Sequence, residues 1–280
     1  MSYEFLPIST DNKAIKEIVG LMRIVFPKAN KYSEAFIEWQ YKNNPEGKVV
    51  GYNAYKNGVL VAHYALIPFK AFLFGKEEGG LLSLNTATHP EHQGKKLFST
   101  LADKSYQLAI EQGYAFVIGV ANANSTPGFV NKLGFQLVGA LDAKLGFGKI
   151  RTSAKNSSIQ FFKKWNKEAL VWRMENPESK YRICDNTIYS ATDKVGIKAA
   201  LLNFSEGIAL SNNNINIGFR PLSLWIGIDA SINWAGSLYF NIPDSMRPSP
   251  LNFIFKDLTK ENRKLEFKNV RFNAVDFDAY

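Results

Sequence analysis

The stretch from Leu81 to Val120 places two apolar strands around a polar loop and an amphipathic helix. We expect strands over 81–88 and 114–120 and a helix over 94–112, where apolar residues recur three and four positions apart. Strand, helix and strand in this order fold with the two strands parallel and the helix on one face. The unit predicts an α/β (α+β) fold whose ligand lies at the carboxyl ends of these strands.

The flanking patterns add antiparallel strands to this unit. Strands are expected over 3–8, 49–55 and 59–74, and helices over 15–25 and 33–41. Asn57-Gly58, between two apolar runs, predicts a tight hairpin. The result is a mixed twisted sheet flanked by helices. Later strands are expected over 222–228, 237–242 and 251–255, with a turn over 244–250 and a further β-rich stretch over 264–277.

Length and composition limit the remaining possibilities. A chain of 280 residues is expected to form two domains, which we place at 1–150 and 151–280. The single cysteine, Cys184, excludes an intramolecular disulfide and disfavours a Cys-rich metal site, so no metal is expected. The net charge of +9 is spread along the chain, which does not favour a nucleic-acid partner. The oligomeric state stays open.

Neither the first residues of the sequence nor its most apolar window predicts a membrane protein. The opening MSYEFLPIST lacks the basic and apolar regions of a secretory signal, so a cytoplasmic location is expected. The apolar window 221–243 contains Asp229, Asn233 and Asn241, each costly in hydrocarbon. We interpret this window as two buried strands joined by a polar turn.

The loop before the expected helix over 94–112 reads His89-Pro-Glu-His-Gln-Gly-Lys-Lys96. A helix N-terminus offers unpaired backbone N–H groups, and Gly94 allows a phosphate to approach them closely. Lys95 and Lys96 add positive charge. The loop therefore predicts a pyrophosphate site, although an ordinary lysine-bearing surface turn has the same composition.

Two segments, THPEHQGKKLFSTLA and ANANSTPGFVNKLGFQLVG, resemble the motifs of the GNAT superfamily of acyl-CoA-dependent N-acetyltransferases, in the right order over residues 3–148. The resemblance implies a GNAT domain over 1–150 that binds acetyl-CoA as co-substrate, without a metal. The cofactor-binding residues expected from it are Ala87, Thr88, Gln93, Gly94, Lys95, Lys96, Leu97, Phe98, Ser99, Asn122, Asn124 and Ser125. Amides at Ala87 or Thr88 would hold the thioester oxygen, and Gln93–Ser99 the pyrophosphate. Asn122, Asn124 and Ser125 would bind pantetheine amides or cap the next helix.

The sequence departs from the family pattern at three points. Lys96 and Phe98 occupy the two small-residue positions of the motif. Lys96 can still offer its N–H, because a helix start does not demand a positive φ, whereas the Phe98 ring either turns into the core or crowds the cofactor. Phe129 and Val130 stand near the position where the family often has a tyrosine acid.

No residue stands out as the catalytic base. Asn85 alternates with Ser83 along the expected strand, so the two are predicted to share a face. We predict a water relayed through Asn85, Ser83 or Tyr64, since an amide accepts no proton usefully. His63 is expected to be a packed strand residue, and His89 and His92 to shape the loop.

The second half repeats one segment of the first. WQYKNNPEGK from Trp39 is echoed by WRMENPESK from Trp172. A degenerate GNAT-like duplication over 151–280 would explain the echo, and so would two unrelated helix ends stopped by Asn-Pro. Counting from the echo, no second phosphate loop occurs. The aromatic residues Trp225, Trp234, Tyr239 and Phe240 either line an acceptor cleft between the halves or pack as core.

The function expected is transfer of an acetyl group from acetyl-CoA to the primary amine of a small molecule, by direct attack in a ternary complex. An amino sugar or a nucleotide-linked sugar would suit the positive charge. Two alternatives stay open: a non-catalytic CoA-binding module with a decayed site, and a relative of tRNA-dependent aminoacyl transferases.

Overall fold

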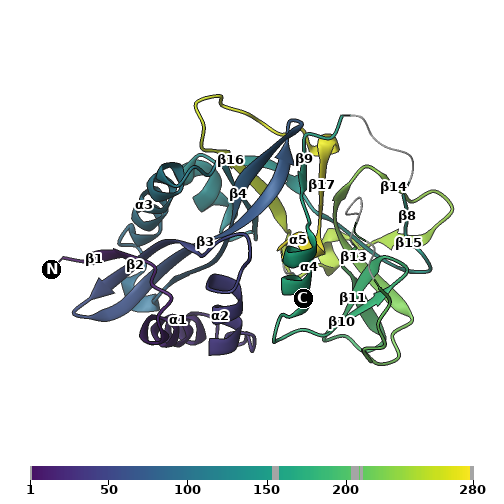
Figure 1. Ribbon diagram of the computed structural model, residues 1–280, viewed down its shortest axis with the longest axis horizontal. Coiled ribbons are helices and arrows are strands. Elements are labelled where there is room, and N and C mark those ends of the chain that lie inside the picture. The colour runs from purple at the N-terminus through teal and green to yellow at the C-terminus, as the bar shows by residue number, and fades with distance from the viewer. Residues whose placement is uncertain (1, 153–157, 203–207, 209–210, 278–280) are drawn as a thin grey trace.

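Two β-rich halves lie side by side and share one sheet, as Figure 1 shows for the computed structural model. The structure describes residues 2–152, 158–202, 208 and 211–277. In the first half the elements are β1 (Glu4–Pro7), α1 (Asn12–Val25), α2 (Glu34–Tyr41), β2 (Val50–Lys56), β3 (Val59–Leu73), β4 (Lys76–Thr88), η1 (Pro90–His92), α3 (Leu97–Glu111), β5 (Phe116–Ala121), η2 (Gly128–Lys132) and β6 (Gln136–Ala140). Every helix and strand expected in this half is present.

The second half is mostly strand. Its elements follow β7 (Asp142–Phe147), the last strand of the first half, and are β8 (Arg151–Thr152), β9 (Phe161–Lys163), α4 (Lys167–Met174), β10 (Tyr181–Cys184), β11 (Thr187–Ala191), β12 (Ile197–Ala200), β13 (Leu222–Asp229), β14 (Ile232–Asn233), β15 (Leu238–Asn241), η3 (Asp244–Met246), β16 (Asn252–Asp257), η4 (Phe267–Asn269), β17 (Val270–Asn273) and α5 (Ala274–Phe277). The stretch 264–277 was expected to be β-rich, yet it contains β17 between two short helices. The fold class is the mixed α/β fold predicted from the sequence.

Local sequence signals set the boundaries of the first elements. The Asp11 side chain accepts the N–H of Ala14 and begins α1, and Ser33 caps α2 in the same way. Asn57 and Gly58 both have positive φ, 49° and 77°, as a two-residue hairpin between β2 and β3 requires. Residues 76–80, which were not expected as strand, extend β4 into a second hairpin with β3.

The two halves exchange a strand. β16 lies between β5 and β6, antiparallel to both, and thus completes the sheet of the first half. β7 leaves the first half and lies between β13 and β15, antiparallel to both. β9 and β17 join the two sets of strands into one 15-stranded sheet, and among the described residues β8 and β14 form a separate two-stranded sheet. We therefore expect the two predicted domains, 1–150 and 151–280, to depend on each other for folding.

The exchanged strand β16 contributes to both faces of its new sheet. Phe253 and Phe255 are fully buried on the side of α1 and α2, and Ile254 is fully buried on the side of α3. Burying side chains of this size contributes about 1.5–3 kcal/mol each. Much of the core around α1, α2 and α3 is therefore supplied by the second half.

The echoed segments adopt the same local structure. In the first, the Asn44 side chain accepts the N–H of Glu46, and in the second the Asn176 side chain accepts the N–H of Glu178. The rings of Trp39 and Trp172 stack with centroids 4.6 Å apart. Each indole N–H donates to the other tryptophan's carbonyl, at 2.7 and 2.9 Å. The two segments thus share a local structure and contact each other, and the duplication stays a prediction.

The second half has the same order of strands but lacks the helix between its parallel pair. β12 and β13 pair in parallel, as β4 and β5 do. Where α3 joins β4 to β5, the described residues between β12 and β13 form no helix. The absence of a second phosphate loop stays a prediction.

The apolar window 221–243 is not a spanning helix. It contains β13, a turn at residues 230–231, β14 and β15. Within the ranges described, no helix is long and apolar enough to cross a membrane.

The strand exchange predicts that residues 1–150 do not fold alone. Without β16, β5 and β6 have no partner between them and the core loses three buried side chains. We expect this fragment to show no cooperative unfolding transition in urea, followed by circular dichroism, whereas the full chain shows one. A cooperative transition of the fragment at the midpoint of the full chain would contradict the prediction.

Candidate functional site

β4 separates from β5 in the middle of its length. The two strands pair in parallel from Gly80 opposite Phe116 to Ser83 opposite Gly119, and no further. Just beyond this point β4 bulges, because Asn85 takes a left-handed conformation with φ of 53°. Asparagine tolerates this conformation better than most residues. The end of β4 beyond Ser83 thus has an edge that β5 does not cover.

The start of α3 carries no side-chain cap. Side chains cap α1, α2 and α4, whereas Lys96, the N-cap of α3, makes no such bond. Gly94 has φ of 74° and open space around the position of a Cβ. The backbone N–H groups of the first turn of α3 are therefore not capped by a side chain, and the anion site there stays a prediction. The expectation for Lys96 was wrong in one respect: its φ is 60°, the conformation for which the motif normally has glycine.

The predicted cofactor residues differ in their exposure. Gln93, Gly94, Lys95 and Lys96 are exposed, while Leu97 is buried in the core beneath α3. The Lys95 ammonium donates to the Glu91 carbonyl at 3.0 Å, which holds it on the loop. Ser99 donates its hydroxyl to the Lys96 carbonyl. Positive charge and free amides thus come from the loop, and Leu97 anchors it.

Phe98 links the start of α3 to η2. Its ring contacts Phe129 edge to face, with centroids 5.3 Å apart, and Tyr64 at 5.9 Å. It also lies against Gly128, where a Cβ would meet the ring at 3.2 Å. Of the two predicted outcomes, the ring therefore turns toward the core, and it closes the gap between these two elements.

The residues after β5 form a capped turn. The Asn122 side chain accepts the N–H groups of Asn124 and Ser125, at 3.0 and 2.9 Å. The Ser125 hydroxyl accepts the N–H of Asn122 in return. Asn122 and Ser125 thus act as caps, one of the two roles predicted for them. The side chain of Asn124 is exposed.

Ser83 and Tyr64 do not share a face with Asn85, so the predicted grouping was wrong. The Ser83 hydroxyl donates to Tyr64, which is 2.6 Å from the hydroxyl of Tyr106 beneath α3. Burial raises the pKa of Tyr64 to about 12. The bulge at Asn85 breaks the alternation of side chains along β4, so Asn85 faces α2 instead.

Asn85 contacts residues that the sequence analysis missed. Its amide nitrogen donates to Gln40 at 2.5 Å and to the Tyr41 hydroxyl at 3.1 Å. Tyr41 bonds in turn to His63, which is fully buried, and burial lowers the pKa of His63 to about 3. His63 is therefore the packed strand residue that was expected. The available signal in the sequence was the pair of polar residues Gln40 and Tyr41 at the end of α2.

The two candidate amides for the thioester oxygen point in different directions. His89 donates its N–H to Val61 of β3, and successive N–H groups of a strand point to opposite edges. The N–H of Thr88 therefore faces the edge away from β3, where β4 has left β5, and that of Ala87 faces β3. Thr88 is thus the better placed of the two.

The three groups His89, Glu91 and His92 bring their ligand atoms within 4.8 Å of one another. His89 accepts the N–H of Glu91 at 3.3 Å, and His92 bonds to the Tyr3 hydroxyl at 2.9 Å. Both histidines thus shape the loop, as expected. The absence of a metal stays a prediction.

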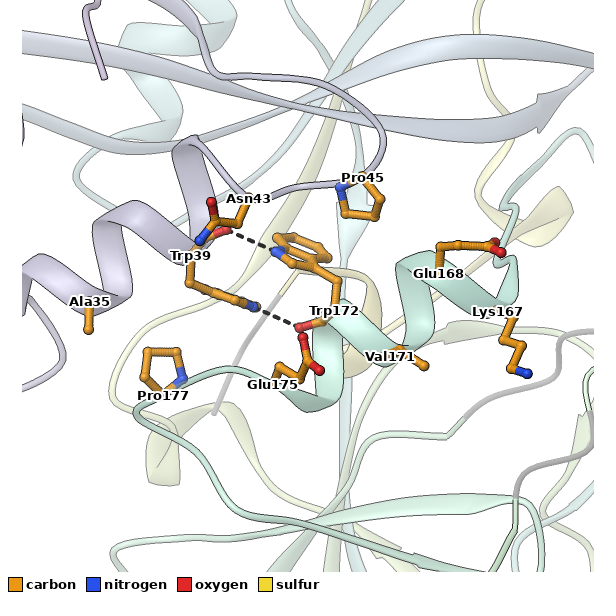
Figure 2. Close-up of a pocket in the computed structure, with 10 residues that line it drawn as sticks. All are labelled: Ala35, Trp39, Asn43, Pro45, Lys167, Glu168, Val171, Trp172, Glu175 and Pro177. Atoms are coloured by element: carbon orange, nitrogen blue, oxygen red, sulfur yellow. Dashed lines mark hydrogen bonds between the residues drawn. The ribbon is translucent and has the colours of Figure 1, made fainter. Parts of the chain in front are cut away.

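An open groove of about 570 Å³ lies between the two halves (Figure 2). It is formed by α2 and α4, with the Trp39–Trp172 stack between them. Its lining is Ala35, Trp39, Asn43, Pro45, Lys167, Glu168, Val171, Trp172, Glu175 and Pro177. None of the aromatic residues proposed for an acceptor cleft lines it. Trp225, Trp234 and Tyr239 pack against one another, and Phe240 is exposed.

Solved structures share this fold at low sequence identity. A probable N-acyltransferase from Enterococcus faecalis is similar over 92% of this chain and 73% of its own, with 10% identity and a TM-score of 0.59. A GCN5-related N-acetyltransferase from Anabaena variabilis matches over the same shares, with 10% identity and a TM-score of 0.60. An N-myristoyltransferase from Saccharomyces cerevisiae, with bound myristoyl-CoA, matches over 95% and 84%, with 11% identity and a TM-score of 0.57.

The comparison with curated proteins found no match. A family model described as an acetyltransferase (GNAT) domain matches residues 8–138, which include β4, the loop before α3, and β5. The uncovered edge of β4 and the uncapped start of α3 both lie within this match. Residues 8–138 of this chain thus match a GNAT acetyltransferase domain, and the fold of the whole chain is similar to those of the solved acyltransferases.

Proposed function

We propose that this protein transfers an acyl group, acetyl in the first instance, from acyl-CoA to the primary amine of a small molecule. The single observation that carries the proposal is the uncapped start of α3 beside the uncovered edge of β4, inside the matched GNAT domain. The amides of Leu97–Ser99 would hold the pyrophosphate, and the N–H of Thr88 would stabilise the thioester oxygen as it gains charge. The amine attacks the carbonyl directly, and the thiolate leaves.

The length of the acyl group is tested by comparing donors of different chain length. One fold relative carries myristoyl-CoA and others are named N-acetyltransferases. A panel of acetyl-CoA, octanoyl-CoA and myristoyl-CoA, with thiol release as the readout, separates these donors. We expect acetyl-CoA to give the highest rate. A preference for myristoyl-CoA would replace acetyl by a long acyl chain and keep the rest of the proposal.

The acceptor is proposed to bind on the other face of the sheet, beside Asn85. Asn85 is half-buried and lies between the last β4–β5 pair and Thr88. Its neighbours Gln40, Tyr41 and Tyr32 come from α2 and the loop before it. The net charge of +9 favours an anionic acceptor, such as an amino sugar linked to a nucleotide.

Substitution of Gly94 tests the pyrophosphate site. Gly94→Asp places a negative charge beside the diphosphate, which at an effective dielectric of about 20 costs several kcal/mol at ~4 Å. We expect the affinity for CoA, measured by calorimetry, to fall at least about tenfold. Gly113→Asp is the matched control, since Gly113 also has a positive φ, 82°, and open space, but lies at the other end of α3.

The control is stringent because an acidic residue is unfavourable near a helix C-terminus and favourable near an N-terminus. Gly113→Asp should lose more stability than Gly94→Asp and still bind CoA. Equal CoA affinity in the two folded variants would show that the start of α3 does not hold the diphosphate.

A second candidate function, a CoA-binding module without activity, is favoured by Phe98. Its ring occupies a position where the motif has a small residue and closes α3 against η2. Under the leading proposal Phe98→Ala loses about 2 kcal/mol of stability from partial loss of packing, measured by urea unfolding, and keeps CoA affinity and thiol release. The second candidate would be favoured by two results together. The wild type would release no thiol, and Phe98→Ala would bind CoA more than ten times as tightly as the wild type does.

A further inference from the structure

A series of hydrogen bonds connects Asn85, in the bulge of β4, to a carboxylate at the surface of α1. In order, its members are Asn85, Tyr41, His63, Asn53, Tyr55 and Glu17. The successive distances are 3.1, 2.9, 2.6, 3.4 and 3.1 Å. We call it the Asn85–Glu17 series. It crosses α2, β3 and β2, and three of its inner members, Tyr41, His63 and Asn53, are fully buried.

The direction of the bonds follows from the Glu17 end. A carboxylate only accepts hydrogen bonds, so the Tyr55 hydroxyl donates to Glu17. The Tyr55 oxygen then accepts from the amide nitrogen of Asn53. The amide oxygen of Asn53 is therefore the group that faces His63, and it accepts from Nδ1–H of the ring.

The protonation state of His63 determines the direction of the next hydrogen bond in the series. Burial lowers the pKa of His63, so the ring is neutral and has one N–H, which it gives to Asn53. Nε2 is left as an acceptor, and the Tyr41 hydroxyl donates to it at 2.9 Å. Burial raises the pKa of Tyr41, which keeps that proton in place.

At its inner end the series fixes the amide of Asn85. The Tyr41 oxygen accepts one N–H of Asn85, and the buried Gln40 accepts the other at 2.5 Å. The Asn85 carbonyl oxygen is left facing the Tyr32 hydroxyl at 3.5 Å, a long contact for an O–H donor. This oxygen therefore has the capacity to accept a second donor.

We propose that the Asn85–Glu17 series orients Asn85 so that its carbonyl oxygen receives an N–H of the acceptor amine. The inference rests on the proposed function and names the residue that binds the nucleophile. Asn85 touches the substrate, and Tyr41 and His63 are positioning residues. A group that only accepts hydrogen bonds, such as a carboxylate, finds no donor at this oxygen, so the site favours groups that donate, as an amine does. The series is not a proton path, since amides interrupt it, and the amine's proton passes to solvent.

The tautomer of His63 tests the direction of the series. The chain has three histidines, so ¹⁵N labelling of histidine in the full protein gives three ring systems, and a His63→Gln variant assigns one of them. We expect His63 to carry its proton on Nδ1. A proton on Nε2 would reverse the bonds to Tyr41 and Asn53 and overturn the inference. This measurement needs neither turnover nor a bound ligand.

Kinetics test the consequence for the amine. Tyr41→Phe removes the hydroxyl that holds one N–H of Asn85, so the amide is free to turn. With acetyl-CoA saturating and the best substrate from a panel of a simple alkylamine, an amino sugar and a lysine peptide, we expect KM for the amine to rise about tenfold. The Kd for CoA should change less than about twofold.

Tyr106→Phe is the matched control. It also deletes a buried tyrosine hydroxyl, 2.6 Å from that of Tyr64, but on the opposite face of the sheet. We expect its KM for the amine to equal that of the wild type. The positioning role would be overturned if KM for the amine rose equally in the two variants. It would also be overturned if Tyr41→Phe raised the Kd for CoA and left KM for the amine unchanged.

The failures of the two proposals are distinguishable. If no donor in the acyl-CoA panel binds or releases thiol, the proposed function fails whatever the tautomer of His63. If acyl transfer proceeds but His63 carries Nε2–H, or Tyr41→Phe leaves KM unchanged, the positioning role fails and acyl transfer stands.

Discussion

The exchange of β16 and β7 between the halves is the constraint on which the candidate site depends. β16 completes the first sheet, and its surroundings also hold the turn after β5. Ser249 accepts the N–H of Ala123, and Asn252 donates to Thr126, each within 3.0 Å. Lys256 donates to the carbonyl of Leu133 at the end of η2. The turn after β5 and the end of η2 are therefore held in place by residues from the other half of the chain.

An ion-pair cluster fixes the far end of this strand. Arg263 donates to Glu78 of β4 at 2.8 Å and to Asp257 of β16 at 2.9 Å, and the three side chains are largely shielded from solvent. Removing one partner from such a cluster leaves the others buried without compensation, so the cluster specifies where β16 lies. Because β4 carries the bulge, the cluster ties the exchanged strand to the same strand that positions Asn85.

Much of the first half was predictable from the sequence because its signals are local. Asp11 and Ser33 cap the helices that follow them, and Asn57-Gly58 makes the expected hairpin. The exchange was not predictable, because the apolar pattern of β16 is the same whether the strand pairs with the first half or with the second. The segment over 251–255 was correctly expected as a strand, but periodicity within a strand says nothing about its partners.

The uncapped start of α3 was predictable from the sequence, and the surroundings of Asn85 were not. The loop before α3 combines glycine, lysines and a helix start within a few residues, so its chemistry is visible in the sequence. Alternation assigned Ser83 and Asn85 to one face, and a single residue in the left-handed region reversed that assignment. The partners of Asn85 lie 44 and 45 residues away on α2, beyond the range of any local pattern.

The two halves share some structural features and differ in others. Both have a parallel strand pair, and both have a turn in which an asparagine before proline accepts the N–H of the glutamate after it. In the first half the parallel pair is joined by α3, whereas the described residues between β12 and β13 form no helix. The second half has a structural part in the first, because β16 lies between β5 and β6 and residues around it bond to the turn after β5. The sheet of the first half is therefore not continuous without a strand from the second, and this dependence couples the candidate site to residues more than a hundred positions away in the sequence.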